Sequence, residues 1–386
     1  MTISLLTIVS LSTLLILTKA TDCTFASSYP RQYVAYKTDH DLVIDGKLDD
    51  SAWQEVGFTE DFVDISTNST PWLRTNAKIR WDDTYLYVGG LLQENSVWAN
   101  ISFTCHCIDP IHDQVIFHDN DFETFIDTDG STHYYKETEF NAANASWDLC
   151  LNKPYNDGGY ENSSRVYGPN GWDMQPPLHG ATYTDGIIND PASHPTHWSI
   201  EIAFPLDKLI YNTSATVPPQ PGQYWRINFS RVEWAVKIIN NQYQKYPSCQ
   251  SCPVPGTNAE DNWVWSPQGS IAMHLPENWG FLQFADGPVN GTAPVRNPEW
   301  TVRSVAMALY YAEHAYASAN NNTYTSDINA LLPYTNDPNV LNGYCTHVPN
   351  ITLGLNGNSF NATINTLDNQ QMATIRDDRY LRVYQI

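Results

Sequence analysis

The feature that most constrains the fold is a series of short apolar or alternating segments between Tyr33 and Phe284. Clusters of Gly, Pro, Asn and Asp separate these segments, and no long stretch has apolar residues at helical spacing. Such a pattern is typical of antiparallel strands joined by turns. We therefore predict an all-β domain, a jelly-roll-like antiparallel β-sandwich of two packed sheets. The predicted strands are Leu42–Ile44, Ala77–Trp81, Leu86–Leu92, Asp121–Ile126, Tyr134–Asn141, His197–Phe204, Tyr224–Trp234 and Phe281–Phe284.

Two long intervals, residues 152–195 and 236–276, contain no predicted strand. They are rich in Trp, Tyr, Pro and Asn. Loops of this length in a compact domain usually carry function, so we expect them to be ordered and to border a site.

The pattern changes after Asp286-Gly287-Pro288. Apolar residues recur at helical spacing from Trp300 to Ala319, and Pro298 just ahead of them suits a helix start. We predict a β-sandwich over residues 21–286 and a small C-terminal α+β extension over residues 298–386, with a packing or interaction role. The extension contains a second, shorter helix from Thr325 and strands at Ile351–Leu355, Ser359–Ile364, Met372–Arg376 and Leu381–Ile386.

The N-terminal segment Ile3–Leu17 is apolar or hydroxylated and ends in Thr18-Lys19-Ala20. An apolar core of about 15 residues is too short for a helix that spans roughly 30 Å of hydrocarbon, and small residues at Thr18 and Ala20 suit signal peptidase. Residues 1–20 are therefore predicted to be a signal peptide, and the mature protein to be secreted, extracellular and free of the membrane. An uncleaved membrane anchor is the alternative.

Secretion predicts N-glycosylation, and Asn-x-Ser/Thr acceptors are frequent in the chain. Asn228 also has this pattern, but it lies inside the apolar run Trp225–Val232, where a glycan would have to occupy a packed strand. The predicted glycosylation sites are Asn68, Asn100, Asn144, Asn162, Asn212, Asn290, Asn321, Asn350 and Asn361.

Seven cysteines in an oxidising compartment predict up to three disulfides and one remaining thiol. The pairing cannot be deduced from the spacing. Cys249-Gln-Ser-Cys252 has the spacing of a redox or zinc half-site, but no second pair accompanies it, which favours a disulfide. The cysteines are Cys23, Cys105, Cys107, Cys150, Cys249, Cys252 and Cys345.

Acidic residues outnumber basic ones by 42 to 20, which argues against nucleic acid or an anionic membrane as a partner. Aromatic residues make up 13% of the chain, and 13 of them are tryptophans. Many rings with few cations suit a surface on which sugar rings stack, although a large aromatic β core would have the same composition.

Several motifs follow one another in a recognisable order. Ile44–Trp53, Trp81–Val88, Asp121–Asp127, His197–Pro205 and Trp225–Trp234 resemble successive motifs of family 9 carbohydrate-binding modules, and Asn262–Pro267 with Pro276–Gly280 extend the likeness. That family consists of β-sandwiches, often attached to glycoside hydrolases. The resemblance covers about residues 40 to 285.

The resemblance implies a site in which two aromatic rings clasp a terminal sugar while polar groups bind its hydroxyls. The rings correspond to Phe117 and Trp265, and the polar contacts to Glu123, Glu139 and Asn141. Family members commonly have Trp where this chain has Phe117, so the stacking face here is smaller, and the sugar that is bound is left open.

The residue pattern supports a polar strand face independently. Between Tyr134 and Asn141 the strand alternation directs Glu137, Glu139 and Asn141 to one side. Arg231 and Glu233 share one face of their strand, where they either pair with each other or contact a sugar.

Asp127-Thr128-Asp129-Gly130 is rich in oxygen ligands but lacks the spacing of an EF-hand loop. Family members often hold structural calcium, and the resemblance therefore implies Ca²⁺ at Asp127 and Asp129. A simple turn would use the same residues.

Together these features predict a secreted carbohydrate-binding protein, rather than an enzyme, that recognises glucan- or mannan-type oligosaccharides in carbohydrate catabolism or at cell walls. One alternative is a glycoside hydrolase, or an accessory module of one, with Glu123 and Glu139 as its two carboxylates. Another is a haem-binding sandwich of the DOMON type, related to the N-terminal domain of dopamine monooxygenase, which would need axial His or Met ligands. The histidines available for it are His106, His112, His118 and His133.

Overall fold

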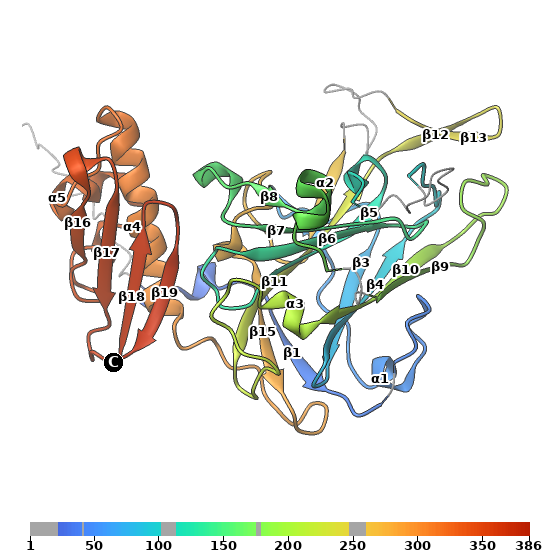
Figure 1. Ribbon diagram of the computed structural model, residues 1–386, viewed down its shortest axis with the longest axis horizontal. Coiled ribbons are helices and arrows are strands. Elements are labelled where there is room, and N and C mark those ends of the chain that lie inside the picture. The colour runs from blue at the N-terminus through green and yellow to red at the C-terminus, as the bar shows by residue number, and fades with distance from the viewer. Residues whose placement is uncertain (1–21, 41, 102–112, 175–178, 247–259) are drawn as a thin grey trace, which may run out of the picture.

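The computed structural model describes residues 22–40, 42–101, 113–174, 179–246 and 260–386 (Figure 1). The signal-peptide prediction for residues 1–20 lies outside these residues. So do Cys105, Cys107, Cys249 and Cys252, and the candidate haem ligands His106 and His112. None of the described helices is both long enough and apolar enough to cross a membrane.

Residues 32–285 form the predicted all-β domain, and its described strands join into one 13-stranded sheet that curls into two layers. Along the sheet the order is β8-β7-β6-β5-β11-β15-β1-β3-β4-β10-β9, with β14 and β2 attached beside β11. The strands are β1 Gln32–Lys37, β2 Val63–Asp64, β3 Thr75–Trp81, β4 Tyr85–Gln93, β5 Asp121–Asp127, β6 Tyr135–Asn141, β7 Ser146–Leu151, β8 Glu161–Asn162, β9 His179–Thr184, β10 His197–Pro205, β11 Tyr224–Glu233, β14 Asp261–Val264 and β15 Gly280–Ala285.

Most strand predictions are confirmed, and the differences have local causes. Leu42–Ile44 is not a strand, because the amide of Val43 donates to the Asp50 carboxylate and not to a neighbouring strand. The sheet is mixed and not purely antiparallel, since β1 pairs in parallel with both β15 and β3. The two long intervals contain more than loops: they include β8, β9 and β14, the hairpin of β12 (Val236–Ile239) and β13 (Gln242–Lys245), and the helix α2 (Ser164–Tyr167). Two further short helices are α1 (Ser51–Gln54) and α3 (Leu206–Leu209).

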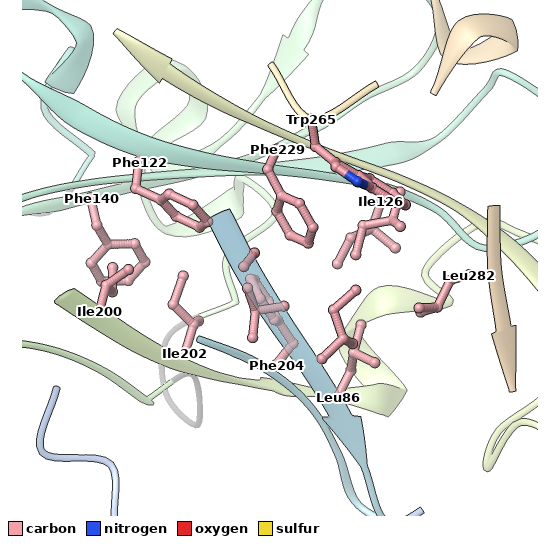
Figure 2. Packing of buried hydrophobic residues seen from close by; sticks show 14 of the residues in the cluster. Leu86, Phe122, Ile126, Phe140, Ile200, Ile202, Phe204, Phe229, Trp265 and Leu282 are labelled. Atoms are coloured by element: carbon pink, nitrogen blue, oxygen red, sulfur yellow. The ribbon is translucent and has the colours of Figure 1, made fainter. Parts of the chain in front are cut away.

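The main core lies between the two layers of the curled sheet. Phe122 of β5, Phe140 of β6 and Phe229 of β11 point toward Ile200 and Phe204 of β10 (Figure 2). The layers approach so closely that a Cβ on Gly90 would lie 2.9 Å from side-chain carbons of both Ile200 and Phe122. Close packing of large rings therefore fixes the position of β5 and β6, whose other face carries the candidate site.

The C-terminal residues form the predicted α+β module. Helix α4 (Trp300–Ala319) packs on a four-stranded antiparallel sheet and buries Val302, Val305 and Leu309 against it. The helix α5 (Ile328–Leu331) follows, and the strands are β16 Asn350–Leu353, β17 Phe360–Asn365, β18 Gln371–Arg376 and β19 Leu381–Gln385.

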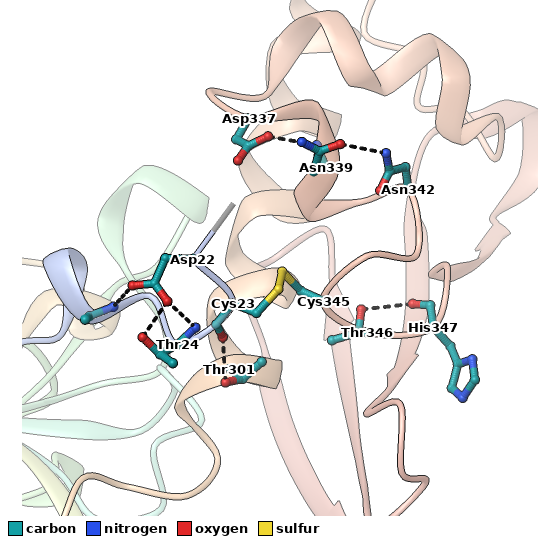
Figure 3. The surroundings of a disulfide bond; sticks show 11 residues. Asp22, Cys23, Thr24, Thr301, Asp337, Asn339, Asn342, Cys345, Thr346 and His347 are labelled. Atoms are coloured by element: carbon teal, nitrogen blue, oxygen red, sulfur yellow. Dashed lines mark hydrogen bonds between the residues drawn. A yellow bond between two sulfur atoms is a disulfide. The ribbon is translucent and has the colours of Figure 1, made fainter. Parts of the chain in front are cut away.

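A disulfide between Cys23 and Cys345 joins the N-terminal segment of the sandwich to this module (Figure 3). The hydroxyl of Thr301 in α4 donates to the carbonyl of Cys23 at 3.0 Å. Cys150 is a buried free thiol in the main core. One of the predicted disulfides is thus present among the described cysteines, and the remaining candidates lie outside the described residues.

A buried arginine also connects the two modules. Arg379 donates to Asp157 at 2.8 Å and to Glu277, and it contacts the hydroxyls of Tyr310 and Tyr311 at 3.1 Å. The side chains of Arg379, Asp157 and Glu277 are 3%, 2% and 7% exposed. Two carboxylates of the sandwich therefore depend on one guanidinium from the C-terminal module.

Arg379→Met is expected to lower the free energy of unfolding by about 3–5 kcal/mol, because it leaves two buried carboxylates without their cation. Urea unfolding followed by tryptophan fluorescence measures this. Arg376→Met is the matched control: its pair with Asp378 is 44% and 23% exposed, and its loss should cost at most about 1 kcal/mol. Equal losses in the two variants would contradict this role of Arg379.

The buried carboxyl of Glu313 in α4 should make the stability of the folded protein depend on pH. Burial raises the pKa of this carboxyl to about 7, partly opposed by the amide of Thr325, which donates to it. The unfolded chain therefore loses this proton at lower pH than the folded chain does, so stability should fall as the pH rises from about 4.5 to about 7. Thermal melts of Glu313→Gln should show a flatter pH profile over this window than wild type, and parallel profiles would refute the assignment.

Candidate functional site

The candidate site lies on the face of β5 and β6 that points away from the main core. The register places Asp121 opposite Asn141 and Glu123 opposite Glu139. Because side chains alternate along a strand, Phe122 and Phe140 enter the core while these polar residues lie on the opposite face. The predicted polar face of β6 is thus present, and Asp121 and Glu123 of the neighbouring strand β5 lie on the same face.

Three of these carboxylates converge. Asp121, Glu123 and Glu139 each offer an oxygen, and these oxygens all lie within 4.8 Å of one another. Their side chains are 0%, 6% and 2% exposed. Glu137, the next acidic residue on the same face of β6, is also buried. We refer to Asp121, Glu123, Glu137 and Glu139 as the acidic cluster.

Few protein groups bind the acidic cluster. The amide of Val232 donates to Asp121 Oδ1 at 3.0 Å, and the amide of Phe117 donates to Glu139 Oε2 at 3.0 Å. Asp121 Oδ2 and Glu137 Oε2 are buried without a hydrogen-bond partner. Within the described part of the chain, no lysine or arginine forms a salt bridge with any of the four carboxylates.

This environment disfavours the charged form of each carboxyl. Burial raises the pKa of Glu123 to about 7, with a smaller upward contribution from the charge of Glu260, although a hydrogen bond with Ser230 lowers it. Burial first, and the neighbouring carboxylates second, raise the pKa values of Asp121 and Glu139 well above the ordinary range. The acidic cluster is therefore a place where protons, a cation or hydroxyl donors are strongly favoured.

Two half-buried aromatic residues, Phe117 and Trp234, are linked to the acidic cluster by hydrogen bonds. Phe117, whose amide binds Glu139, accepts a hydrogen bond from the indole of Trp234 through its carbonyl at 2.8 Å. The ammonium of Lys245 lies 3.6 Å from the centre of one Trp234 ring, so it covers part of one face. The backbone of Phe117 thus connects Glu139 to the indole of Trp234, while the ring of Phe117 lies 4.8 Å, centre to centre, from the ring of His118.

Trp265, the second predicted stacking residue, is not at this site. Its side chain is 0% exposed and packs in the main core, with its ring centre 5.9 Å from that of Phe229 (Figure 2). Its indole nitrogen donates to Glu60 at 3.0 Å. Trp265 therefore offers no ring face to a ligand in this structure, and its position corrects the predicted aromatic pair.

Sequence reasoning missed Trp234 as a site residue. It directly follows Glu233, the last residue of β11, and its own amide donates to Asn120 Oδ1 just ahead of β5. The sign that could have identified it is this position: a tryptophan that comes directly after a buried strand remains near the surface.

Arg231 and Glu233 lie together on the core side of β11, away from the acidic cluster. Arg231 is 0% exposed, donates to Glu233 at 2.7 Å and 3.0 Å, and donates to Glu94 at 2.8 Å. Its guanidinium also lies over the Trp263 ring at 5.1 Å. Of the two roles that the sequence left open, the structure favours the buried ion pair.

Asn141 is fully occupied by the protein itself. Its amide nitrogen donates to the carbonyl of Ile101 at 2.7 Å and to Asp119 at 3.0 Å, and its oxygen accepts from Ala143 and Ala145. This asparagine therefore stabilises the turn between β6 and β7, and the structure gives it no free group for a ligand.

Of the predicted calcium residues, Asp127 is the last residue of β5 and Asp129 lies in the turn that follows it. Asp129 accepts hydrogen bonds from Ser131 and from both the amide and the hydroxyl of Ser214. Asp127 accepts from the amide of Thr132, while its other oxygen is buried without a partner. The described residues whose acidic atoms could converge on an ion are Asp121, Glu123 and Glu139 instead.

The predicted glycosylation sites differ in exposure. Asn144 and Asn162 are half-buried, and the Asn144 amide nitrogen, the atom that would carry the glycan, donates to the carbonyl of Gly180. Asn228 is 0% exposed, in keeping with its exclusion as an acceptor. The remaining sites are exposed, namely Asn68, Asn100, Asn212, Asn290, Asn321, Asn350 and Asn361.

No family model matches this chain, and no curated protein matches it. The chain is similar to solved structures of a family 9 carbohydrate-binding module from Caldicellulosiruptor kristjanssonii. The module in complex with cellotriose aligns at 14% identity and TM-score 0.41 over 69% of this chain and 100% of that one. The module in complex with glucose aligns at 13% identity and TM-score 0.41 over the same shares.

Because Trp265 is buried in the core, its removal should destabilise the fold. Trp265→Ala should lower the free energy of unfolding by about 3–5 kcal/mol, because it opens a large cavity in the core. Trp72→Ala is the matched control, since Trp72 is 44% exposed and should cost about 1 kcal/mol. Denaturant unfolding of both variants measures the difference, and a stable Trp265→Ala protein would contradict the core role.

Proposed function

We propose that this protein binds carbohydrate at the acidic cluster and the two rings beside it, Phe117 and Trp234. The observation that carries the proposal is the convergence of carboxylate oxygens from β5 and β6, within 4.8 Å, together with the hydrogen bonds that connect Glu139 to Phe117 and Phe117 to the indole of Trp234. Sugars combine hydroxyl donors with apolar ring faces. Carboxylates can accept hydrogen bonds from the hydroxyls, and aromatic rings can stack on the apolar faces.

The state of the carboxylates supports a ligand that donates hydrogen bonds. Asp121 Oδ2 and Glu137 Oε2 have no partner, although a buried acceptor without a donor is costly. Vicinal hydroxyls of a pyranose could donate to such oxygens. Anionic polymers would be repelled by these carboxylates and by the net charge of −22.

The sequence motifs add to this proposal, because those of β5, β10 and β11 resemble family 9 carbohydrate-binding modules in residues and order. On that basis we propose glucan- or mannan-type oligosaccharides as ligands, in carbohydrate catabolism or at cell walls. We also propose that the chain is secreted and N-glycosylated. The exposed acceptor asparagines and the Cys23–Cys345 disulfide support this, since disulfides persist in oxidising compartments.

A glycoside hydrolase is the second candidate, favoured by one observation. Retaining glycosidases need two carboxyl groups about 5–5.5 Å apart, and Glu123 and Glu139 lie opposite each other on neighbouring strands with their oxygens within 4.8 Å. Both residues, however, lie on the same sheet face, whereas the two catalytic carboxyls of a glycosidase flank the scissile bond. Binding therefore has the stronger support.

The test is calorimetry of the full secreted chain with cello- and manno-oligosaccharides. Trp234→Ala and Phe117→Ala should each weaken binding about tenfold, which is about 1.4 kcal/mol, because each removes a stacking face. Tyr384→Ala, an exposed ring in β19, is the control and should leave the affinity unchanged.

If wild type releases reducing sugar from these oligosaccharides and Glu123→Gln does not, the function is hydrolysis and not binding. If no oligosaccharide binds and none is cleaved, the carbohydrate proposal fails. A haem-type absorption band in the purified protein would favour the haem-binding sandwich instead.

A further inference from the structure

The acidic cluster poses an electrostatic problem that the described protein groups do not solve. Three carboxylate oxygens within 4.8 Å of one another repel strongly when they are shielded from water. Buried charges in proteins are normally paired with an opposite charge or bound to a metal ion. No lysine or arginine of the described residues forms a salt bridge with Asp121, Glu123 or Glu139.

A fourth side chain points to a missing partner independently of these three. Glu137 is 6% exposed, and its carboxyl forms a hydrogen bond with Glu139, yet its Oε2 atom has no partner. Asp121 Oδ2 is likewise unbound, while Asp121 Oδ1 is held by the amide of Val232. The protein therefore fixes one oxygen of Asp121 and leaves the other available to a ligand.

The chemistry of these donors selects the ion. All of them are carboxylate oxygens, which suit hard divalent cations, whereas zinc and copper sites in proteins usually include nitrogen or sulfur ligands. Ca²⁺ accepts six to eight oxygens in irregular geometry, while Mg²⁺ demands a near-ideal octahedron. An arrangement drawn from two strands, with some positions left for outside oxygens, fits Ca²⁺ better.

The position of the trio connects the ion to the rings. Glu139 binds the amide of Phe117, and the carbonyl of Phe117 binds the indole of Trp234. An ion held by the trio would therefore lie beside the surface on which we propose that sugar stacks. Vicinal hydroxyls of that sugar could supply the oxygens that the protein does not.

We infer that Asp121, Glu123 and Glu139 hold a Ca²⁺ ion, and that bound sugar completes its coordination. The first part stands on the carboxylates alone, and the second part rests on the proposed function. The site differs from the Asp127–Asp129 turn, where Asp129 already accepts three hydrogen bonds from Ser131 and Ser214.

The experiment titrates CaCl₂ into EDTA-stripped, dialysed full-length protein by calorimetry, with terbium luminescence and thermal melting as further readouts. Wild type should bind Ca²⁺ and melt at higher temperature with it, because the ion binds the folded chain. Asp121→Asn, Glu123→Gln and Glu139→Gln should each weaken Ca²⁺ binding at least tenfold. Without calcium these variants should melt at the same temperature as wild type or higher, because each relieves repulsion.

Two control variants separate this site from other acidic positions. Glu313→Gln removes a buried carboxylate in the C-terminal module, and Asp129→Asn removes one from the turn after β5. Both should keep the wild-type calcium affinity. Loss of calcium binding in Asp129→Asn alone would move the ion to that turn and overturn the inference, as would an absence of calcium binding in wild type.

Glycan binding in calcium and in EDTA separates the two proposals. Binding that requires calcium supports both. Glycan binding of equal strength in EDTA overturns the role of calcium in sugar recognition and leaves the proposed function intact. Calcium binding without any glycan binding overturns the proposed function and, with it, the proposal that sugar completes the coordination of the ion. The inference that the three carboxylates hold Ca²⁺ would still stand.

Discussion

The strict alternation of side chains along β5 and β6 is the constraint on which the rest of the structure depends. Phe122 and Phe140 on one face fill the space between the sheet layers, so the two strands cannot slip by one residue without burying Glu123 and Glu139 in the core. The same alternation then places the carboxylates of Asp121, Glu123, Glu137 and Glu139 together on the opposite face of the two strands. The apolar core thus supplies the rigidity that holds like charges within 4.8 Å of one another.

The C-terminal module contacts the sandwich through Arg379. Arg379 binds Asp157 and Glu277, and residues close to Glu277 in sequence, His274 and Trp279, pack on Tyr135 of β6. His274 accepts or donates a hydrogen bond with Tyr135 at 2.9 Å, and its ring packs against Tyr155 with centres 4.7 Å apart. Through Arg379 the module therefore binds two segments of the sandwich, one of which packs on Tyr135 in β6, two residues before Glu137 of the acidic cluster.

The sequence predicts those strands in which apolar and polar residues alternate clearly or form a short apolar run. β3, β4, β5, β6, β10, β11 and β15, and helix α4, appear where local periodicity places them. β1 escapes prediction because it pairs in parallel with β15, a strand that lies far away in sequence. The same limit applies to the site: alternation predicts that Glu137 and Glu139 share a face, but only the pairing of β5 with β6 brings Glu123 opposite Glu139.

Trp265 and Trp234 show why the position of a tryptophan in a motif does not determine whether its ring is buried. The order of strands in a sheet does not determine which ring a layer buries, since burial depends on the space that neighbouring residues leave. A Cβ on Gly280 would lie 2.2 Å from the Trp265 ring, so this glycine leaves the gap into which the indole turns inward. Trp234 follows the last residue of β11, and its ring stays half-buried, with the indole nitrogen bound to the carbonyl of Phe117. Exposure at the end of a strand, and not motif position, therefore decides which tryptophan can meet a ligand.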